Sequence, residues 1–188
     1  RLGGVEHGQR LTPGHHVVTL AVRDAQGHGV VRELAVEVAD PEVVFAAATY
    51  CFSTGTDFTG CPAGATHVTT TDPTAIAGYA GPTRRLLLRR GDTWTTSQPI
   101  AIETAGPSVL GAFGACASPD ARGLCANAPR LTTTSAGITL LSISGDWRVM
   151  DLDLAGVTGT SNSTGVGVGG IGTLLLRVRT RGFQQGVV

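Results

Sequence analysis

Two aspartates and two arginines late in the sequence have the side chains and the spacing to form a charged site. Asp151 and Asp153 are separated by one residue, and Arg177 and Arg179 repeat that spacing. Carboxylates can hold Ca²⁺, but Ca²⁺ takes six to eight oxygens and two aspartates supply too few. Arginines beside them would also neutralise the charge that a cation needs. We therefore favour an exposed ladder of ion pairs, each contributing up to about 1 kcal/mol, over a catalytic or calcium site.

Two tryptophans, Trp94 and Trp147, have the side chains best suited to stack on a sugar ring. A single tryptophan at the edge of a strand serves at least as often to cap a hydrophobic core. Packing is therefore the favoured role for both side chains, and ligand contact is the alternative.

Four cysteines form two close pairs in the sequence, Cys51 with Cys61 and Cys116 with Cys125. Four cysteines allow three disulfide connectivities. Each close pair encloses a segment that can bend back on itself, and the sequence contains no C-x-x-C to present two thiolates to zinc. Disulfides are therefore favoured over free buried thiols, with a metal site last. They indicate an exported protein, found outside the cell or at its surface.

The composition excludes several partners and chemistries. The 188 residues carry 14 cationic side chains, all of them arginine, against 14 carboxylates, so the formal net charge is +0 at pH 7. No basic surplus exists to neutralise phosphates, which excludes nucleic acid as the expected partner. The absence of lysine excludes lysine-dependent chemistry. The uncharged stretch 154–176 is long enough to span a membrane, but its glycines, serines and threonines indicate loop and strand instead.

The first part of the sequence predicts a β-hairpin. Residues 16–23 and 33–38 alternate between apolar and polar side chains, a period of two that is typical of half-buried antiparallel strands. Between them, Asp24 opens a turn and Gly27 supplies its positive φ.

The same segment resembles the C-terminal part of a PKD-type immunoglobulin-like domain of bacterial exported proteins. The resemblance is carried by L-T-P-G at 11–14, V-T-L-A-V at 18–22, D-A-Q-G at 24–27 and V-E-V at 36–38. It implies a partial Ig-like antiparallel segment over residues 1–42. Because an Ig-like sandwich needs about seven strands and two are evident, we expect the chain to be a fragment of a longer protein.

From residue 43 onward, short apolar runs separated by Gly, Thr and Pro predict strands with very little helix. The runs cover residues 85–89, 100–103, 109–113, 138–143, 147–154 and 174–180. Two of these runs contain similar motifs, 150–154 and 174–178, which lie about 24 residues apart, a repeat length typical of a solenoid. Alternation predicts one interior row in each run and charged side chains opposite it. The expected interior residues are Met150, Leu152 and Leu154 in one run and Leu174, Leu176 and Val178 in the other.

Several of these runs resemble bacterial right-handed parallel β-helix proteins of the pectate-lyase-like group. R-R-L-L-L-R-R-G-D-T-W at 84–94 and G-P-S-V-L-G-A-F-G at 106–114 are similar to opening coils, and 146–154 and 174–178 are similar to later rungs. The resemblance implies an all-β protein in which residues 43–188 form the N-terminal coils of a right-handed parallel β-helix.

The resemblance also implies where chemistry would lie. Enzymes of that group hold Ca²⁺ with carboxylates on an outward sheet and use an arginine or lysine to remove a proton from the sugar. The resemblance therefore makes Ca²⁺ the candidate cofactor. The catalytic candidates that it implies are Asp151, Asp153, Arg177 and Arg179.

No complete set of acid, base and metal ligands is evident, so we favour a non-catalytic extracellular or cell-surface module for adhesion, polysaccharide contact or assembly. The expected partners are a polysaccharide or other copies of the protein, without insertion into a membrane. One alternative is a polysaccharide lyase or glycoside hydrolase whose catalytic coils lie beyond Val188. Another is a structural filament subunit.

Overall fold

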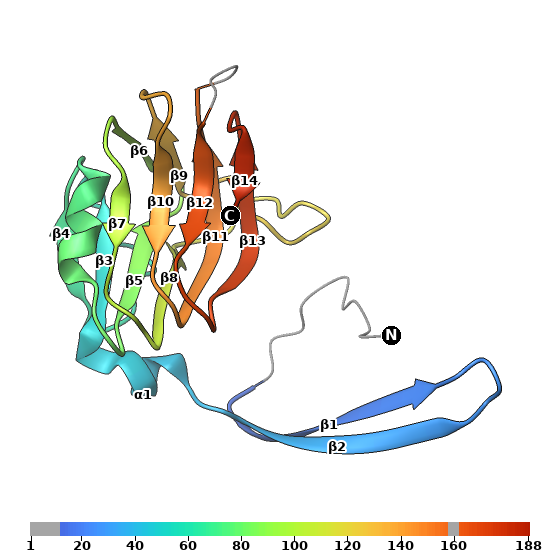
Figure 1. The fold of residues 1–188 in the computed structure, drawn as a ribbon. Coiled ribbons are helices and arrows are strands. Elements are labelled where there is room, and N and C mark those ends of the chain that lie inside the picture. The colour runs from blue at the N-terminus through green and yellow to red at the C-terminus, as the bar shows by residue number, and fades with distance from the viewer. Residues whose placement is uncertain (1–11, 158–161) are drawn as a thin grey trace. The chain divides into compact units, whose positions relative to one another are not determined.

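The computed structural model describes residues 12–157 and 162–188. The chain divides into two compact units, Arg1–Val44 and Phe45–Val188. Almost all regular structure in the described residues is strand, as the sequence predicts (Figure 1). The helices are short: α1 covers Pro41–Phe45, and the 3₁₀ segments η1 and η2 cover Ala46–Ala48 and Pro73–Tyr79. No helix among the described residues has the length and apolar character to cross a bilayer.

The first unit contains the predicted hairpin. Strand β1 (Gly14–Arg23) pairs antiparallel with β2 (Gly29–Val38) over its whole length. The carboxylate of Asp24 accepts hydrogen bonds from the backbone N–H groups of Gln26 and His28, and Gly27 has φ +90°. The turn therefore forms for the reasons that its sequence gives. The described part of this unit contains these two strands, and they do not make up an immunoglobulin-like sandwich.

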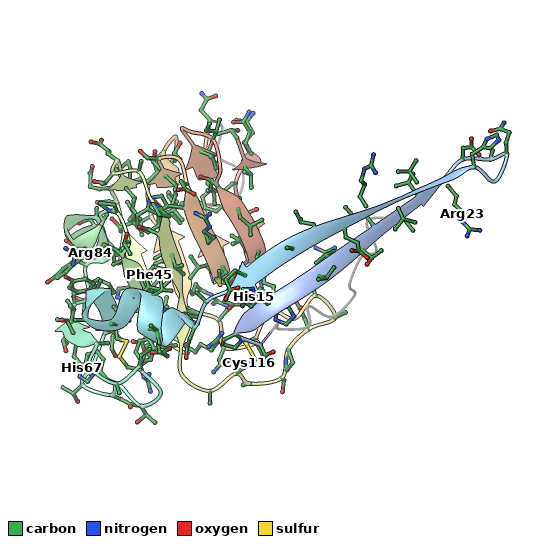
Figure 2. All side chains as sticks on the ribbon, turned by 90° about the horizontal axis from the view of Figure 1, so that it is seen from below. His15, Arg23, Phe45, His67, Arg84 and Cys116 are labelled. Atoms are coloured by element: carbon green, nitrogen blue, oxygen red, sulfur yellow. A yellow bond between two sulfur atoms is a disulfide. The ribbon has the colours of Figure 1, made fainter. Side chains whose placement is uncertain are left out.

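Both faces of the hairpin are open within the first unit. One face carries the apolar row that the alternation predicts, and its members remain largely exposed: Val18, Leu20, Val22, Val30 and Leu34. The other face carries Glu33 and Glu37, the second of which forms an ion pair with His15 across the strands. Figure 2 shows side chains projecting from both faces of the two strands. An isolated two-stranded hairpin is marginally stable in water, so this apolar row lacks the burial that stabilises a sheet.

The second unit is built from two parallel sheets. The larger sheet has its strands in the order β4-β3-β5-β8-β11-β9-β6, with β13 pairing β11 as well, and it curls into a half-barrel. Its strands are β3 (Thr49–Ser53), β4 (Thr66–Thr69), β5 (Arg85–Arg89), β6 (Thr93–Thr96), β8 (Ser108–Phe113), β9 (Arg130–Thr133), β11 (Trp147–Ala155) and β13 (Leu174–Arg181).

The smaller sheet has the order β14-β12-β10-β7, and its strands lie next to one another across the view of Figure 1. Its strands are β7 (Ile100–Ile102), β10 (Thr139–Ile143), β12 (Thr164–Val168) and β14 (Gln185–Val187). The chain alternates between the two sheets, since β7, β10, β12 and β14 each follow a strand or pair of strands of the larger sheet. This alternation and the parallel pairing are consistent with a β-helix-like solenoid. All six apolar runs predicted as strands are strands.

The register stacks equivalent residues on successive strands of the larger sheet. Leu86, Leu110, Val149 and Leu175 occupy one row, because β5 pairs β8, β8 pairs β11 and β11 pairs β13. Their side chains belong to one hydrophobic core that includes both tryptophans and residues of the smaller sheet. Each fully buried aliphatic side chain contributes about 1.5–3 kcal/mol to folding.

The outer face of the larger sheet has a second, smaller cluster at one end. Cys51, Leu87 and Phe113 are buried there, and Phe58 packs against them from the segment that follows β3. The Phe58 ring lies parallel to Phe113 and to His67, with ring centroids 6.3 Å and 4.3 Å apart. The disulfide between Cys51 and Cys61 ties this segment to the sheet, so the outer face is covered at this end.

The predicted interior row of β11 and β13 is wrong in part, because the alternation changes phase within each strand. Asp151 and Arg177 adopt the left-handed region, with φ of 63° and 54°. Before these residues, Trp147, Val149 and Leu175 point inward; after them, Leu152, Leu154 and Val178 do so. Met150 therefore lies outside the core, and Leu174 and Leu176 are 52% and 41% exposed. The predicted proximity of the two runs is correct, because Met150 pairs with Leu176.

Candidate functional site

The candidate residues lie on the outer face of the larger sheet, on adjacent strands β11 and β13. Met150 pairs with Leu176 and Leu152 pairs with Val178, so Asp151 and Arg177 occupy the same position on the two strands. Each occupies the left-handed region, which is costly for residues other than glycine and asparagine. The matched distortion turns both side chains outward and toward each other.

Asp153 is the centre of the largest charge cluster. Its carboxylate accepts hydrogen bonds from Arg179 Nε (3.1 Å), Arg130 Nε (3.0 Å) and Arg181 Nη2 (2.7 Å). The residue is 1% exposed, whereas the three arginine side chains are 42–47% exposed. We call these four residues the Asp153 cluster. Burial raises the pKa of Asp153, but the hydrogen bonds and charges of the arginines outweigh it and hold the pKa below its ordinary value.

Asp151 forms a second, more enclosed cluster. Its carboxylate accepts hydrogen bonds from Arg177 Nε (2.5 Å) and Nη2 (3.2 Å), and Arg90 Nη2 lies 3.4 Å from Oδ2. The side chains of Asp151, Arg177 and Arg90 are 9%, 22% and 11% exposed. The hydrogen bonds from Arg177 to Asp151 raise the pKa of the guanidinium. A Cβ added to Gly123 would lie 3.2 Å from Arg177 Cδ, so the loop between β8 and β9 runs directly beside this cluster.

The ion pairs between β11 and β13 are present, but their predicted exposure is wrong. Alternation placed Asp151 and Asp153 on a solvated face, and both are buried beneath the arginines, at 6% and 1% exposure. The reason is that Arg90, in the turn after β5, and Arg130, on β9, reach the same carboxylates from the side of β11 opposite β13. Each aspartate is therefore enclosed by arginines from both sides of β11.

This arrangement does not fit Ca²⁺. Both oxygens of Asp151 and both oxygens of Asp153 are occupied by guanidinium groups. A cation at either carboxylate would meet two or three positive charges at short range, whereas Ca²⁺ needs several unneutralised oxygens. Among the described residues, no group of three or more His, Cys, Asp or Glu side chains is placed to hold a metal ion.

The two tryptophans are buried in the core and present no ring face to a ligand. Trp94 and Trp147 are each 0% exposed. Their indole N–H groups donate to the backbone carbonyl oxygens of Thr70 (3.0 Å) and Thr104 (2.8 Å). Packing, the favoured role, accounts for both residues, because a buried indole needs one partner for its N–H and finds it in a neighbouring turn.

The cysteines pair as the predicted neighbours. Cys51 bonds to Cys61 with their Cα atoms 6.2 Å apart, and Cys116 bonds to Cys125 with their Cα atoms 5.4 Å apart. The first disulfide lies over the outer cluster of the larger sheet. The second closes the long loop between β8 and β9, the same loop that borders the Asp151 cluster. Two disulfides make an oxidising compartment, such as the cell exterior, the plausible location.

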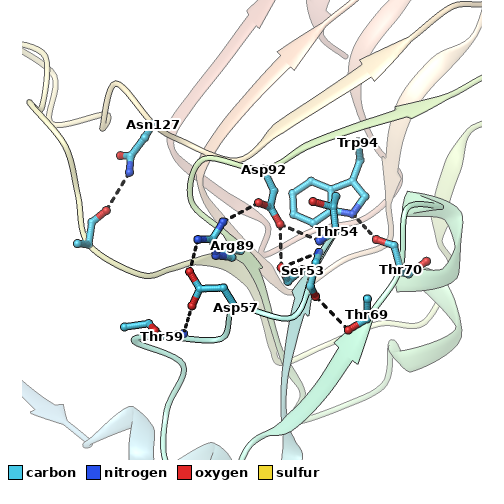
Figure 3. Close-up of polar contacts among 12 residues, drawn as sticks. Ser53, Thr54, Asp57, Thr59, Thr69, Thr70, Arg89, Asp92, Trp94 and Asn127 are labelled. Atoms are coloured by element: carbon cyan, nitrogen blue, oxygen red, sulfur yellow. Dashed lines mark hydrogen bonds and ion pairs between the residues drawn. The ribbon is translucent and has the colours of Figure 1, made fainter.

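A third carboxylate network, which the sequence analysis does not predict, lies at the covered end of the sheet. Asp92 is 8% exposed and accepts hydrogen bonds from the hydroxyl of Ser53 (3.0 Å) and the N–H of Thr54 (2.7 Å). Arg89 bridges Asp92 (2.8 Å) to Asp57 (Figure 3). The only signal in the sequence was the three-residue spacing of Arg89 and Asp92.

Asp57 is the acid of this network whose pKa is shifted most strongly. The N–H and hydroxyl of Thr59 together with Arg89 lower the pKa of Asp57 to about 2. Burial raises the pKa of Asp92, but its hydrogen bonds from Thr54, Arg89 and Ser53 lower it to below the ordinary value. The network joins the loop after β3 to the turn between β5 and β6, and the lowered pKa values keep both carboxylates ionised at neutral pH.

A shallow polar hollow of about 350 Å³ lies beside the turn that follows β6. Its lining is hydroxyl-rich and contains one carboxylate, which already accepts hydrogen bonds from the N–H and hydroxyl of Thr74. The lining residues are Thr71, Asp72, Thr74, Thr95, Thr96, Ser97 and Gln98.

Comparison of the chain with protein-family models, with curated protein sequences and with solved structures found no match.

Proposed function

We propose that the protein is a non-catalytic extracellular module that binds anionic polysaccharide through the Asp153 cluster, on coils of a right-handed parallel β-helix. Right-handed crossovers are the rule for parallel strands in one sheet. The observation that carries the proposal is the charge balance of the cluster. Three guanidinium groups surround one carboxylate, which leaves two positive charges, and all three arginines remain partly open to solvent.

The buried aspartate makes the cluster a prepared site. Three arginines this close would repel one another, and Asp153 holds each of them by a hydrogen bond. Each guanidinium has five N–H donors in a fixed planar arrangement and donates one hydrogen bond to Asp153. Further donors are therefore directed away from the sheet. Asp120 also acts on Arg179 through its charge. With Asp120 included, the balance of the cluster is still positive.

The spacing of the arginines suits a linear polyanion. The backbone positions of Arg179 and Arg181 are about 7 Å apart along β13, and that of Arg130 lies two strands away, about 10 Å across the sheet, so the three side chains approach Asp153 from different directions. A chain that carries a carboxylate or sulfate on successive sugars can reach all three. A neutral glycan would lack partners here, because both tryptophans are buried.

The proposal is tested by equilibrium binding of polygalacturonate and of neutral dextran at low and high salt. We expect binding of polygalacturonate that weakens as salt rises, and none of dextran. The double variant Arg130→Gln/Arg181→Gln retains Arg179 beside Asp153, and its affinity should fall by about tenfold, as expected for two exposed ion pairs.

The matched control is Arg23→Gln/Arg32→Gln, which removes the same charge from the hairpin of the first unit. It should bind polygalacturonate like the unaltered protein. An equal loss of affinity for polygalacturonate in both double variants would show that the Asp153 cluster is not the site. Binding of dextran as tight as that of polygalacturonate would show the same. Release of unsaturated uronic products would contradict the non-catalytic role and favour a polysaccharide lyase.

A further inference from the structure

The outer face that carries the Asp153 cluster continues from β13 and β11 over β9 to β6. Arg181 of β13 pairs with Ala155 of β11, and Ala155 pairs with Thr132 of β9. Thr132 in turn pairs with Thr95 of β6, so the four residues form one row across the strands. The row includes three strand spacings, which is about 14 Å. A polysaccharide bound at the arginines can therefore follow this row toward β6.

At its β6 end, the row opens into the shallow polar hollow. Thr95 belongs to both, because it occupies the last position of the row and also lines the hollow. The other walls come from the turn after β6 and from the segment that leads into η2. The hollow of about 350 Å³ is therefore continuous with the face that carries the Asp153 cluster.

The two ends of the row offer opposite hydrogen-bonding partners to a ligand. The arginines at the β13 end have N–H donors and no acceptor. At the β6 end, the hydroxyl proton of Thr132 is directed at the carbonyl oxygen of Trp94 (3.1 Å). Thr95 is therefore the donor in the hydrogen bond between the two threonine hydroxyls (2.8 Å). Because a hydroxyl has one proton and two lone pairs, the oxygen of Thr95 is left as an acceptor.

The hollow itself is also rich in acceptors. The hydroxyl of Thr74 donates to both oxygens of Asp72 (2.7 and 2.8 Å), and the hydroxyl of Thr96 donates to the carbonyl oxygen of Gln98 (3.0 Å). Among the described residues that line the hollow, Asp72 alone carries a charge. A sugar hydroxyl can donate to these acceptors, whereas a sugar carboxylate would meet the negative charge of Asp72.

The disulfide-closed loop between β8 and β9 disfavours the other way out of the Asp153 cluster, toward the Asp151 cluster. Gly123 of this loop lies beside Arg177, and Asp120 acts on Arg179 through its charge. A polyanion that extended toward the loop would meet the carboxylate of Asp120. The row toward β6 is therefore the more favourable path for the chain.

We propose that the row and the hollow extend the polysaccharide site, so that acidic sugars lie at the arginines and an uncharged sugar occupies the hollow. This inference rests on the proposed function, because binding at the Asp153 cluster brings the chain to the row. The ligand is therefore an acidic polysaccharide that also contains uncharged sugars. Thr95 and Asp72 determine specificity, the first by accepting from a sugar hydroxyl and the second by disfavouring a carboxylate. The hollow is shallow, so it adds selectivity and does not bind a neutral glycan alone.

Equilibrium binding of two polymers tests the role of Asp72. Polygalacturonate carries a carboxylate on every sugar, whereas in hyaluronan a carboxylate sugar alternates with an uncharged one. Asp72→Asn removes the charge and keeps the cap of η2, because Asn caps a helix as well as Asp does. Affinity for polygalacturonate should rise by about two- to fivefold as the repulsion is lost. Affinity for hyaluronan should fall, because an amide is a weaker acceptor than a carboxylate. Asp24→Asn, in the hairpin, removes the same charge and should change neither affinity.

A second pair of variants tests the role of Thr95. Thr95→Val keeps the shape of the side chain and removes its acceptor, so affinity for hyaluronan should fall by about two- to fivefold. Thr95→Ser keeps the hydroxyl and should bind like the unaltered protein. Both variants change an exposed side chain, so the fold is retained.

The outcomes distinguish this inference from the proposed function. Opposite changes for the two polymers in Asp72→Asn, with a loss in Thr95→Val that Thr95→Ser does not show, support the inference. Equal changes for both polymers in Asp72→Asn, or unaltered affinity in Thr95→Val, overturn it. If Arg130→Gln/Arg181→Gln still lowers the affinity for polygalacturonate, the proposed function stands without the extension. An unaltered protein that binds neither polymer overturns both.

Discussion

The outer face of the larger sheet is covered by different groups at its two ends. Around β3 and β5, Leu87 is buried beneath a disulfide-bonded loop, and the outer side chains form a small core. Around β11 and β13, Leu176 is exposed, and arginines gathered on buried aspartates take the place of a covering loop. Leu87 and Leu176 nevertheless belong to the same outward row, through Gly111 and Met150.

The comparison shows that one sheet face can be completed in two ways. A covered end adds apolar burial and stability to the fold. An open end leaves apolar surface exposed, which proteins retain where a partner or ligand uses it. We therefore expect substitutions at the covered end to change stability alone, and substitutions at the open end to change binding as well.

The largest effect is expected at the open end, for Asp153→Asn. The substitution leaves three arginines close together without the carboxylate that holds them, and breaking a buried ion pair in this way costs about 3–4 kcal/mol. Urea unfolding followed by the fluorescence of the two buried tryptophans measures the change. Asp146→Asn is the control, because Asp146 forms an ion pair with Arg148 and its side chain is 42% exposed, and it should cost less than about 1 kcal/mol. Equal costs would mean that the Asp153 cluster contributes no more than a surface pair.

Removal of the first disulfide should have the next largest effect. The double variant Cys51→Ala/Cys61→Ala opens a ten-residue loop and should lower the free energy of unfolding by about 3 kcal/mol in the chain-entropy treatment. The loss of Cys51 from the small outer core adds to it. Cys116→Ala/Cys125→Ala opens a loop of nearly the same length. Without comparable apolar packing it should cost less, and the reverse order would show that the covered end is not stabilised by its loop.

How much of this comparison could be predicted from the sequence depends on where the backbone is regular. The six apolar runs became strands, and the local cysteine pairs became disulfides, because both follow from patterns within short segments. The phase of β11 and β13 could not be predicted, since Asp151 and Arg177 adopt a left-handed conformation that sequence patterns assign to glycine.

The burial of Asp153 could not be predicted from the sequence for a different reason. It depends on Arg130, which lies 23 residues earlier on β9, a short strand that alternation did not indicate. β11 is long enough to pair with both β8 and β9, so its two halves have different neighbours. Contacts of this kind are set by the stacking of coils and leave no local signal.

A smaller effect, and a direct comparison of the two ends, comes from shortening the two leucines of the shared outward row. Leu87→Ala removes a side chain that is 3% exposed and should cost about 2–3 kcal/mol, at the low end for core leucines because the cluster is small. Leu176→Ala should cost less than about 1 kcal/mol, because the side chain is already 41% exposed. Thermal or urea unfolding of the two variants measures the loss of stability in each. Similar costs would mean that the open end is covered in solution.

The smallest effect is expected from acid titration of the two ends. The folded pKa of Asp153 lies below its ordinary value, so the carboxylate stabilises the fold above the unfolded pKa of about 4. That contribution is lost as the pH falls through the lowered folded value. Asp57, at the covered end, has a folded pKa of about 2, so its contribution is lost between about pH 4 and pH 2. Stability should therefore fall with decreasing pH below about 4, and not rise.

Two variants separate these contributions. Asp153→Asn and Asp57→Asn should each flatten the dependence of the unfolding free energy on pH below about 4, since each removes one group that binds a proton on unfolding. Because Asp57 is exposed, added salt should weaken its contribution more than that of Asp153, whose carboxylate is enclosed by arginines. If salt weakened both contributions equally, the carboxylate of Asp153 would be as solvated as that of Asp57, and the arginines would not be held in place for a ligand.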